Sequence, residues 1–298
     1  MDKIFYNEAS AAKLGWEPEW FGAKEFDEEL VKKIRLFQRK HPDLTDDGLC
    51  GPSTHRRIWT AREELLTSYP QLELRNHPKV NHIIYNNDFF EIEWPRVILP
   101  FNNGGLKHTK GYKKVYKKRK PSMFIVHWDV CLSSESCFRV LQRRGCSIHF
   151  TIDNDSTIRQ HLDMNHIAVH AGSKVNAKSI GVEISNAFYP RYNKWYKDNG
   201  FGERPLVEGA KVHGKSMKPF MDFYPEQIDA LKALIKAVNK ATGIPLDCPL
   251  DRQGNTSYNV STPVARATFK GVASHYHVTK RKIDCANLDL KQILEDIK

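Results

Sequence analysis

Side chains that ligate metals are concentrated near the C-terminus, in residues 275–285 (HYHVTKRKIDC). His275, His277, Asp284 and Cys285 offer imidazole, carboxylate and thiolate groups, which are the groups that hold Zn²⁺ in proteins. A lysine among them could hold an anionic reaction intermediate. Such a density of ligating groups is rarely structural, so the segment predicts a metal site.

A further histidine, His127, directly follows the apolar run of residues 123–126 (MFIV). A short, continuously apolar run is typical of a buried strand, and such a strand can deliver the next side chain to a site at its end. A lone buried histidine is more often a satisfied core residue than a ligand. The combination with His275 and Asp284 makes His127 a candidate ligand.

The elements that would position these groups are strands interspersed with helices. Residues 148–153 and 157–160 are expected to form a hairpin, and residues 179–185 a further strand. Residues 225–241 predict an amphipathic helix that ends before Gly243. Strands before and between helices indicate an α/β domain with a mixed central β-sheet flanked by helices.

The N-terminal part has a helical pattern instead. In residues 26–41 an apolar stripe predicts an amphipathic helix, and the Asp-Gly turn at residues 46–48 ends it. A second helix is expected to begin near residues 51–54. The apolar stripes of the two helices consist of Leu30, Ile34 and Phe37, and of Ile58, Ala61 and Leu65. A module of this size is too small to hold an elaborate active site.

The run 37–41 (FQRKH), followed by residues 47–54 (DGLCGPST), resembles the three-helix peptidoglycan-binding domain found beside many wall hydrolases. The resemblance covers roughly residues 26–66 and implies that residues 1–75 form a wall-binding helical domain. The alternative is a small helical hairpin without that function. Cys50 stands where the family more usually has Val or Phe, and we interpret it as a core substitution.

Several motifs occur in the order of a known enzyme family. Residues 126–128 (VHW), 148–153 (IHFTID), 170–172 (HAG) and 179–183 (SIGVE), together with the C-terminal segment, resemble the zinc amidases. That family includes the N-acetylmuramoyl-L-alanine amidases, phage lysozyme-type amidases and animal peptidoglycan recognition proteins. The resemblance spans about residues 121–290. It implies hydrolysis of the amide bond between N-acetylmuramic acid and the L-alanine of the stem peptide.

The resemblance implies a zinc ion held by His127, His275 and a third ligand from the Lys-x-Asp or Lys-x-Cys element, here with Asp284. Three protein ligands leave a fourth position for water, as in catalytic zinc sites. Cys285 stands where the family commonly has proline, so ligation by its thiolate stays open as a second choice. His277 is a further second choice, because on a strand it would point to the same face as His275. We favour Asp284.

The same resemblance assigns catalytic roles. Glu183 matches the acidic residue that takes the proton of the water and passes it to the leaving amine. Lys282 would stabilise the oxyanion, and His170 would line the substrate cleft, unless it is merely structural. Ile148 stands where phage-type members use a tyrosine, but Glu183 resembles the glutamate-using branch. Asp129 either orients a ligand imidazole or is a turn residue.

The chain divides into three expected parts: the helical domain 1–75, a basic connecting segment 76–120 and a catalytic domain 121–298. The net charge of +11 implies an anionic partner. Residues 107–120 carry eight lysines and arginines, which either are solvated or contact anionic wall polymers. No known nucleic-acid-binding signature accompanies them, so nucleic acid is not expected. The partner that the motifs imply is bacterial peptidoglycan.

The N-terminal residues lack the pattern of a secretory signal, and no apolar run is long enough for a membrane span. We therefore expect synthesis in the host cytoplasm and action on the cell wall, as a phage endolysin or a virion-associated lysin. The six cysteines are expected to be reduced. Residues 186–223 are expected to form a long loop at the cleft. The rival interpretation is a recognition protein that binds peptidoglycan without cutting it.

Overall fold

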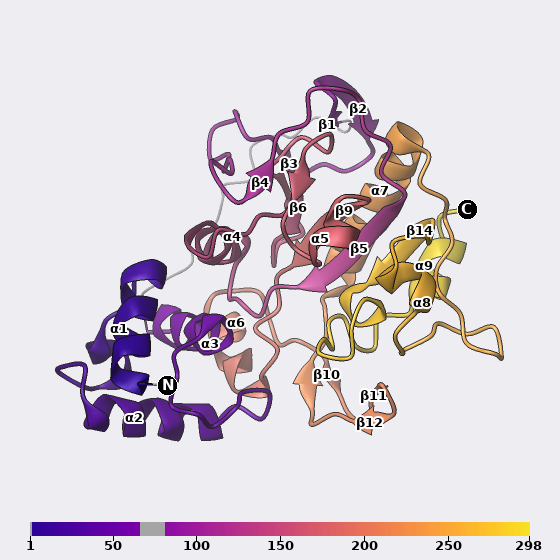
Figure 1. The fold of residues 1–298 in the computed structure, drawn as a ribbon. Helices are drawn as coiled ribbons and strands as arrows, with labels where there is room; N and C mark the ends of the chain where they lie inside the picture. The colour runs from indigo at the N-terminus through magenta and orange to yellow at the C-terminus, as the bar shows by residue number, and fades with distance from the viewer. Residues whose placement is uncertain (1, 66–80) are drawn as a thin grey trace.

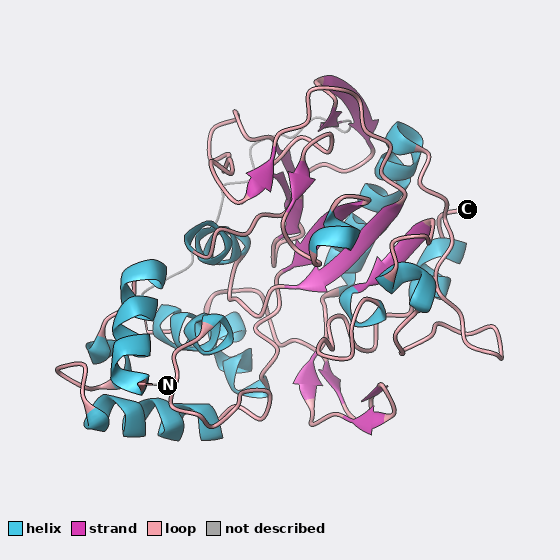
Figure 2. Ribbon diagram, viewed as in Figure 1, coloured by secondary structure: helices cyan, strands magenta, loops and turns pink. Residues whose placement is uncertain are grey.

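The computed structural model describes residues 2–65 and 81–298 (Figure 1). Residues 2–65 form an N-terminal helical module, and residues 81–298 form an α/β body in which the strands are concentrated (Figure 2). The predicted fold class is confirmed. The module contains α1 (Lys3–Leu14), η1 (Pro18–Phe21), α2 (Glu28–Arg39) and α3 (Pro52–Glu63).

The helical module has a buried core of its own. Leu30 and Ile34 of α2 pack with Trp16 and with Cys50, which is fully buried. The interpretation of Cys50 as a core residue is therefore confirmed. The stripe expected on α3 is wrong at Leu65, which lies beyond the end of the helix and is 82% exposed.

A six-stranded mixed sheet forms the centre of the α/β body, in the order β14-β5-β9-β6-β7-β3. Its strands are β3 (Val97–Ile98), β5 (Met123–Trp128), β6 (Phe150–Ile152), β7 (Ile158–Gln160), β9 (Ser179–Ile184) and β14 (Gly271–Ser274). Strands β14, β5, β9 and β6 are parallel, and β6 and β7 form the expected antiparallel hairpin. Parallel strands bring their carboxyl ends to one edge of the sheet.

Successive side chains of β5 point to opposite faces of the sheet and pack in two different apolar clusters. Phe124, Val126 and Trp128 belong to the main core with α7, whereas Met123 and Ile125 belong to a smaller apolar cluster. The helices of the α/β body are α4 (Ser134–Arg143), α5 (Ser173–Asn176), α6 (Asn193–Asp198), α7 (Pro225–Thr242), α8 (Thr262–Ala265) and α9 (Leu290–Glu295), with η2 (Pro190–Tyr192) and η3 (His275–His277). None of the described helices is long and apolar enough to cross a membrane.

Two segments differ from their expected form. The described part of the connecting segment, residues 81–120, packs on the α/β body, because β3 joins the sheet beside β7 and Ile83 and Ile92 enter the main core. Residues 186–223 contain ordered elements as well as loops. The additional strands are β1 (Asn81–Tyr85), β2 (Asp88–Ile92), β4 (Tyr112–Lys113), β8 (Ile167–Ala168), β10 (Leu206–Val207), β11 (Lys211–Val212), β12 (Lys215–Ser216) and β13 (Phe220–Met221).

Helix α3 joins the helical module to the α/β body (Figure 1). The Trp59 indole donates to the Ser136 hydroxyl of α4 at 2.9 Å, and the Thr60 hydroxyl donates to the Val130 carbonyl at 2.9 Å. The Trp59 ring also packs against the apolar cluster beneath α4. The module is therefore docked through a specific face of α3.

Glu63, at the end of α3, gives this interface a pH dependence. Burial raises the pKa of Glu63 to about 7, although the Ser136 hydroxyl lowers it. A carboxyl with a raised folded pKa contributes stability that is present below its ordinary value of 4.5 and is lost as the pH rises through about 7. We expect Glu63→Gln to raise the free energy of unfolding by about 1 to 3 kcal/mol at pH 8 and to change it little at pH 4.

Urea denaturation of the full chain at both pH values measures this difference. Glu203→Gln, which alters an exposed carboxylate paired with Lys197, is the matched control and is expected to show no such pH dependence. An equal gain at pH 4 and pH 8 for Glu63→Gln would show that ionisation of Glu63 is not the cause.

Candidate metal centre and active-site cleft

The candidate ligands meet at the carboxyl edge of the parallel strands. His127 lies near the end of β5, and His275 directly follows β14, the neighbour of β5 in the sheet. Asp284 follows in the loop after η3. All three side chains are buried. Sheet order thus brings together residues that are far apart in the sequence.

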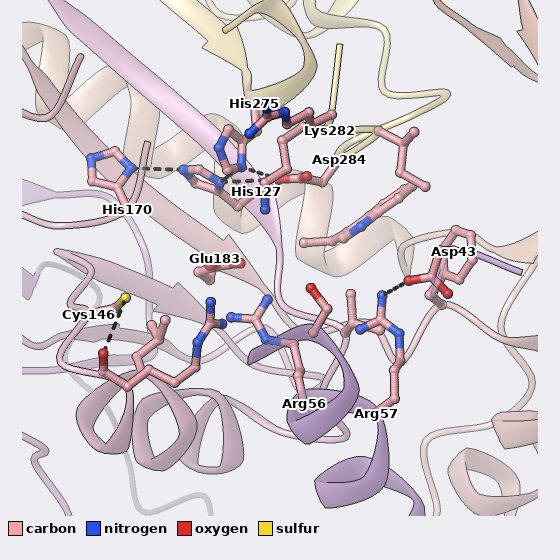
Figure 3. Close-up of a pocket in the computed structure, with 18 of the residues that line it drawn as sticks. Asp43, Arg56, Arg57, His127, Cys146, His170, Glu183, His275, Lys282 and Asp284 are labelled. Atoms are coloured by element: carbon pink, nitrogen blue, oxygen red, sulfur yellow. Dashed lines mark hydrogen bonds and ion pairs between the residues drawn. The ribbon is translucent and has the colours of Figure 1, made fainter. Parts of the chain in front are cut away.

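Three ligating atoms converge in this cluster (Figure 3). Nδ1 of His127 and Nδ1 of His275 lie 2.9 Å apart. Oδ2 of Asp284 lies 3.2 Å from the first and 2.9 Å from the second. Ligands held about 2.0 to 2.1 Å from a tetrahedral zinc ion lie about 3.3 Å from one another. The group therefore fits a zinc ion with three protein ligands, the number found in catalytic sites.

The protonation states of the cluster also suit a metal. Burial, together with the adjacent His275, lowers the pKa of His127 to about 4, although the hydrogen bond with Asp284 raises it. Burial alone would raise the pKa of Asp284, but His275 and the hydrogen bonds from both histidines hold that pKa well below its usual range. A neutral imidazole and an ionised carboxylate are the forms that ligate metals.

The second nitrogen of His127 faces another histidine. Nε2 of His127 lies 2.9 Å from Nδ1 of His170, and Nε2 of His170 lies 3.1 Å from the Ser179 hydroxyl. A metal held at Nδ1 of His127 would leave the proton on Nε2, which could then donate to His170 and fix the ring. Gly181 leaves room for this arrangement, because a Cβ there would lie 2.7 Å from the His170 ring.

Glu183 lies beside the cluster, in register with His127 on the neighbouring strand β9 (Figure 3). Its side chain is buried, and Oε2 has no hydrogen-bond partner among the described residues. Burial raises the pKa of Glu183 to about 8, although Arg56 lowers it. A carboxyl that titrates near neutrality can both accept and donate a proton at neutral pH.

Residues 117–286 match the family model described as N-acetylmuramoyl-L-alanine amidase. This span covers more than half of the chain and contains the whole cluster together with Glu183. The chain belongs to the N-acetylmuramoyl-L-alanine amidase family. Its activity is the hydrolysis of the amide bond that joins N-acetylmuramic acid to the L-alanine of the peptidoglycan stem peptide.

Solved structures similar to the amidase come from several bacteria. N-acetylmuramoyl-L-alanine amidase LysC from Clostridium intestinale URNW is 16% identical over 68% of this chain and 98% of that chain, with a TM-score of 0.40. A mutant endolysin from Bacillus subtilis is 19% identical over 68% and 99%, with a TM-score of 0.36. AmpDh3 from Pseudomonas aeruginosa, solved in complex with anhydromuramic pentapeptide, is 18% identical over 61% and 63%, with a TM-score of 0.39. No curated protein sequence matches the amidase.

The two second-choice ligands of the amidase lie outside the cluster. Residues 275–277 form the helix η3, so the expectation that His275 and His277 point to one face of a strand is wrong. Instead, Nδ1 of His277 accepts from the Ser274 backbone at 3.0 Å. Cys285 is fully buried in the main core. Among the residues in 2–65 and 81–298, His127, His275 and Asp284 are the group placed to hold a metal.

Two other candidates occupy different surroundings. Lys282 lines the cavity beside the cluster and has an exposed side chain, so it lies at the rim rather than in a dry interior. Asp129 accepts hydrogen bonds from the Cys131 and Asn186 backbones at 2.9 and 3.0 Å and from the Ser185 hydroxyl at 3.0 Å. Asp129 thus organises the loop after β5.

A cavity of about 540 Å³ opens onto the cluster. It is lined by His170 and Glu183 from the α/β body and, on the opposite side, by residues of the helical module (Figure 3). The module residues are Asp43, Ser53, Arg56 and Arg57. Sequence reasoning missed them, because the module was interpreted as a separate domain and no motif links it to the catalytic segments.

Proposed function

We propose that the amidase is zinc-dependent and holds one Zn²⁺ with His127, His275 and Asp284. The observation that carries this proposal is the convergence of three buried ligating atoms at the cavity wall, with separations of 2.9 to 3.2 Å. Imidazole nitrogen and carboxylate oxygen are both zinc ligands. Asp284 is preferred to Cys285 because its oxygen faces both histidines.

When held by His127, His275 and Asp284, zinc would lower the pKa of a bound water and polarise the scissile carbonyl. Glu183, on the adjacent strand, accepts a proton from the attacking water and donates it to the amine of L-alanine as that amine leaves. Its burial keeps the proton available at neutral pH. Lys282, at the rim, stabilises the negative charge that develops on the carbonyl oxygen.

Metal analysis tests the ligand set directly. The purified full chain is stripped with a chelator, dialysed against zinc and assayed for bound metal and for release of stem peptides. We expect about one zinc per chain in the unaltered protein and no tight zinc in His127→Ala, with activity following the metal. Full activity in the stripped protein would overturn the zinc proposal.

His170 is expected to act through His127. Loss of the hydrogen bond in His170→Ala should weaken zinc affinity about 10- to 100-fold, because such partners fix the tautomer and orientation of a ligand. Competition with a chromogenic chelator measures this affinity. His166→Ala, which alters a partly buried histidine outside the cluster, is the control. Unchanged zinc affinity with weaker substrate binding would instead assign His170 to substrate contact alone.

We also propose that residues 1–75 bind peptidoglycan and that residues 107–120 contact anionic wall polymers. The separate core of the helical module supports the first assignment. The lysines of residues 107–120 are exposed, whereas Arg119 bonds the Met164 and Ser179 carbonyls, so the charge of the lysines is available to a polyanion. Binding to sacculi should then weaken as salt rises. This combination suits an endolysin or a virion-associated lysin.

A further inference from the structure

The N-terminal helical module forms part of the catalytic cavity. Arg56 and Arg57 lie on the first turns of α3, and both line the cavity together with Glu183. Figure 3 shows Arg56 pointing from α3 toward Glu183, on the side away from His127. A domain that only tethered the enzyme to its polymer would not need to place side chains there.

The α3 docking contacts hold this wall in place. The guanidinium of Arg57 donates to the Tyr189 hydroxyl at 3.0 Å and to Asp43 at 2.5 Å. Tyr189 also donates to Asp43. The side chain of Arg57 is only 12% exposed, so this charge is matched within the protein. Arg57 therefore holds the helical module against the α/β body through Tyr189, whereas Arg56 faces the cavity.

The charge on the cavity wall is unbalanced. The described lining residues include seven lysines and arginines and three carboxylates. Asp43 is bonded to Arg57, and Asp284 faces the two ligand histidines. Of the three acidic side chains, Glu183 is thus the one that faces the six lysines and arginines other than Arg57.

Two of these cations meet on the wall opposite the cluster. Arg144 directly follows α4 and lines the same cavity as Arg56 of α3. Burial, together with the nearby charge of Arg56, lowers the pKa of Arg144 to about 10. The Nε atoms of both arginines are buried without hydrogen-bond partners in the described part of the chain. Two like charges on one wall repel each other, and an anion bound from the cavity would stabilise both guanidinium groups.

We propose that Arg56 and Arg144 bind a free carboxylate of the stem peptide, so that the helical module completes the substrate site. This inference rests on the proposed function. The lactyl carboxyl of muramic acid is consumed in the scissile amide, and the free carboxylates of the substrate therefore lie on the stem-peptide side. A guanidinium recognises a carboxylate through two parallel hydrogen bonds. In the proposed mechanism Glu183 protonates the leaving amine of L-alanine, so the stem peptide extends from that amine past Glu183. Arg56 lies on that side of Glu183, away from His127 (Figure 3).

Two soluble substrates that differ in one group test the proposal: N-acetylmuramoyl-L-alanyl-D-isoglutamine, which has one free carboxylate, and its γ-amide, which has none. We expect the unaltered zinc-loaded chain to favour the carboxylate substrate by about 10- to 100-fold in kcat/KM, mainly through KM. Arg56→Gln and Arg144→Gln should each bring the two substrates to within about threefold of each other. The preference ratio is the readout, because a change in Glu183 affects both substrates alike.

Matched arginines serve as controls. Arg62, on α3 but stacked over Trp20, and Arg139, on α4 and paired with Glu135, do not line the cavity. Arg62→Gln and Arg139→Gln are expected to keep the preference. Equal use of both substrates by the unaltered chain, or a preference that survives both Arg56→Gln and Arg144→Gln, would overturn the proposal.

Binding separates this proposal from the zinc mechanism. Calorimetry with the chelator-treated full chain compares the same two compounds without hydrolysis. We expect weaker binding of the amide by about 10-fold or more, and loss of that difference in Arg56→Gln. If the carboxylate compound binds preferentially but is never cut, the proposed function fails and the anion site stands. If cutting occurs with no preference in binding or rate, the anion site fails alone.

Discussion

Replacing Asp284 with alanine is expected to abolish hydrolysis of peptidoglycan, with kcat/KM falling by at least about 10³-fold. Asp284 is the anionic member of the cluster, and its Oδ2 faces both histidine nitrogens at 2.9 and 3.2 Å. Without it, two imidazoles remain, and they hold zinc far less tightly than three protein ligands. Release of stem peptides and zinc content are measured on the same preparations.

Cys285 provides the matched control for Asp284. It is the neighbouring residue and the alternative ligand that the sequence left open, yet its thiol is buried in the core. Cys285→Ala is expected to keep zinc and activity, with a loss of stability only. If Asp284→Ala retained zinc and Cys285→Ala lost it, the ligand set would be wrong at this position.

Glu183→Gln is expected to lower kcat by about 10²- to 10⁴-fold, because the amide cannot accept and return the proton. Its side chain faces the cavity beside the three ligating atoms but is not one of them. Zinc content should therefore match that of the unaltered chain, which distinguishes this variant from Asp284→Ala. Steady-state rates with a soluble muramoyl peptide, together with metal analysis, measure both quantities.

Glu203→Gln, which alters an exposed carboxylate paired with Lys197, is the control for Glu183. It is expected to leave kcat unchanged within about twofold. Nearly normal turnover in Glu183→Gln would remove Glu183 from the proton transfer and leave that role without a residue in the present account.

The sheet and the place of the candidate ligands were predictable because local patterns specify them. The apolar run that precedes His127 is a buried strand, as expected, and the helix that ends at Gly243 has the predicted form. The positions of side chains in the C-terminal segment were harder to predict. Whether a side chain there faces the cluster or packs in the core depends on the local backbone conformation. A 3-10 turn after β14 separates His275 from His277, and alternation along a strand could not anticipate that.

The cavity wall opposite the cluster could not be predicted. Arg56 and Arg144 are more than eighty positions apart in the sequence, on helices with separate amphipathic patterns. Their meeting depends on how α3 docks on α4 through Trp59 and Ser136, a contact between two surfaces rather than a periodicity in either. The packing of residues 81–120 on the α/β body could not be predicted for the same reason, since it also depends on contacts between distant surfaces. Their basic composition indicated a linker.

The measurement that tests the central claim most directly is mass spectrometry of the products from bacterial sacculi. The chelator-treated full chain is compared with the same preparation after zinc is restored. The account predicts that zinc restores the release of intact stem peptides with a free L-alanine amino group, leaving glycan strands with unsubstituted lactyl groups. Sacculi that are bound but uncut in the presence of zinc, or cut at another bond, would contradict it.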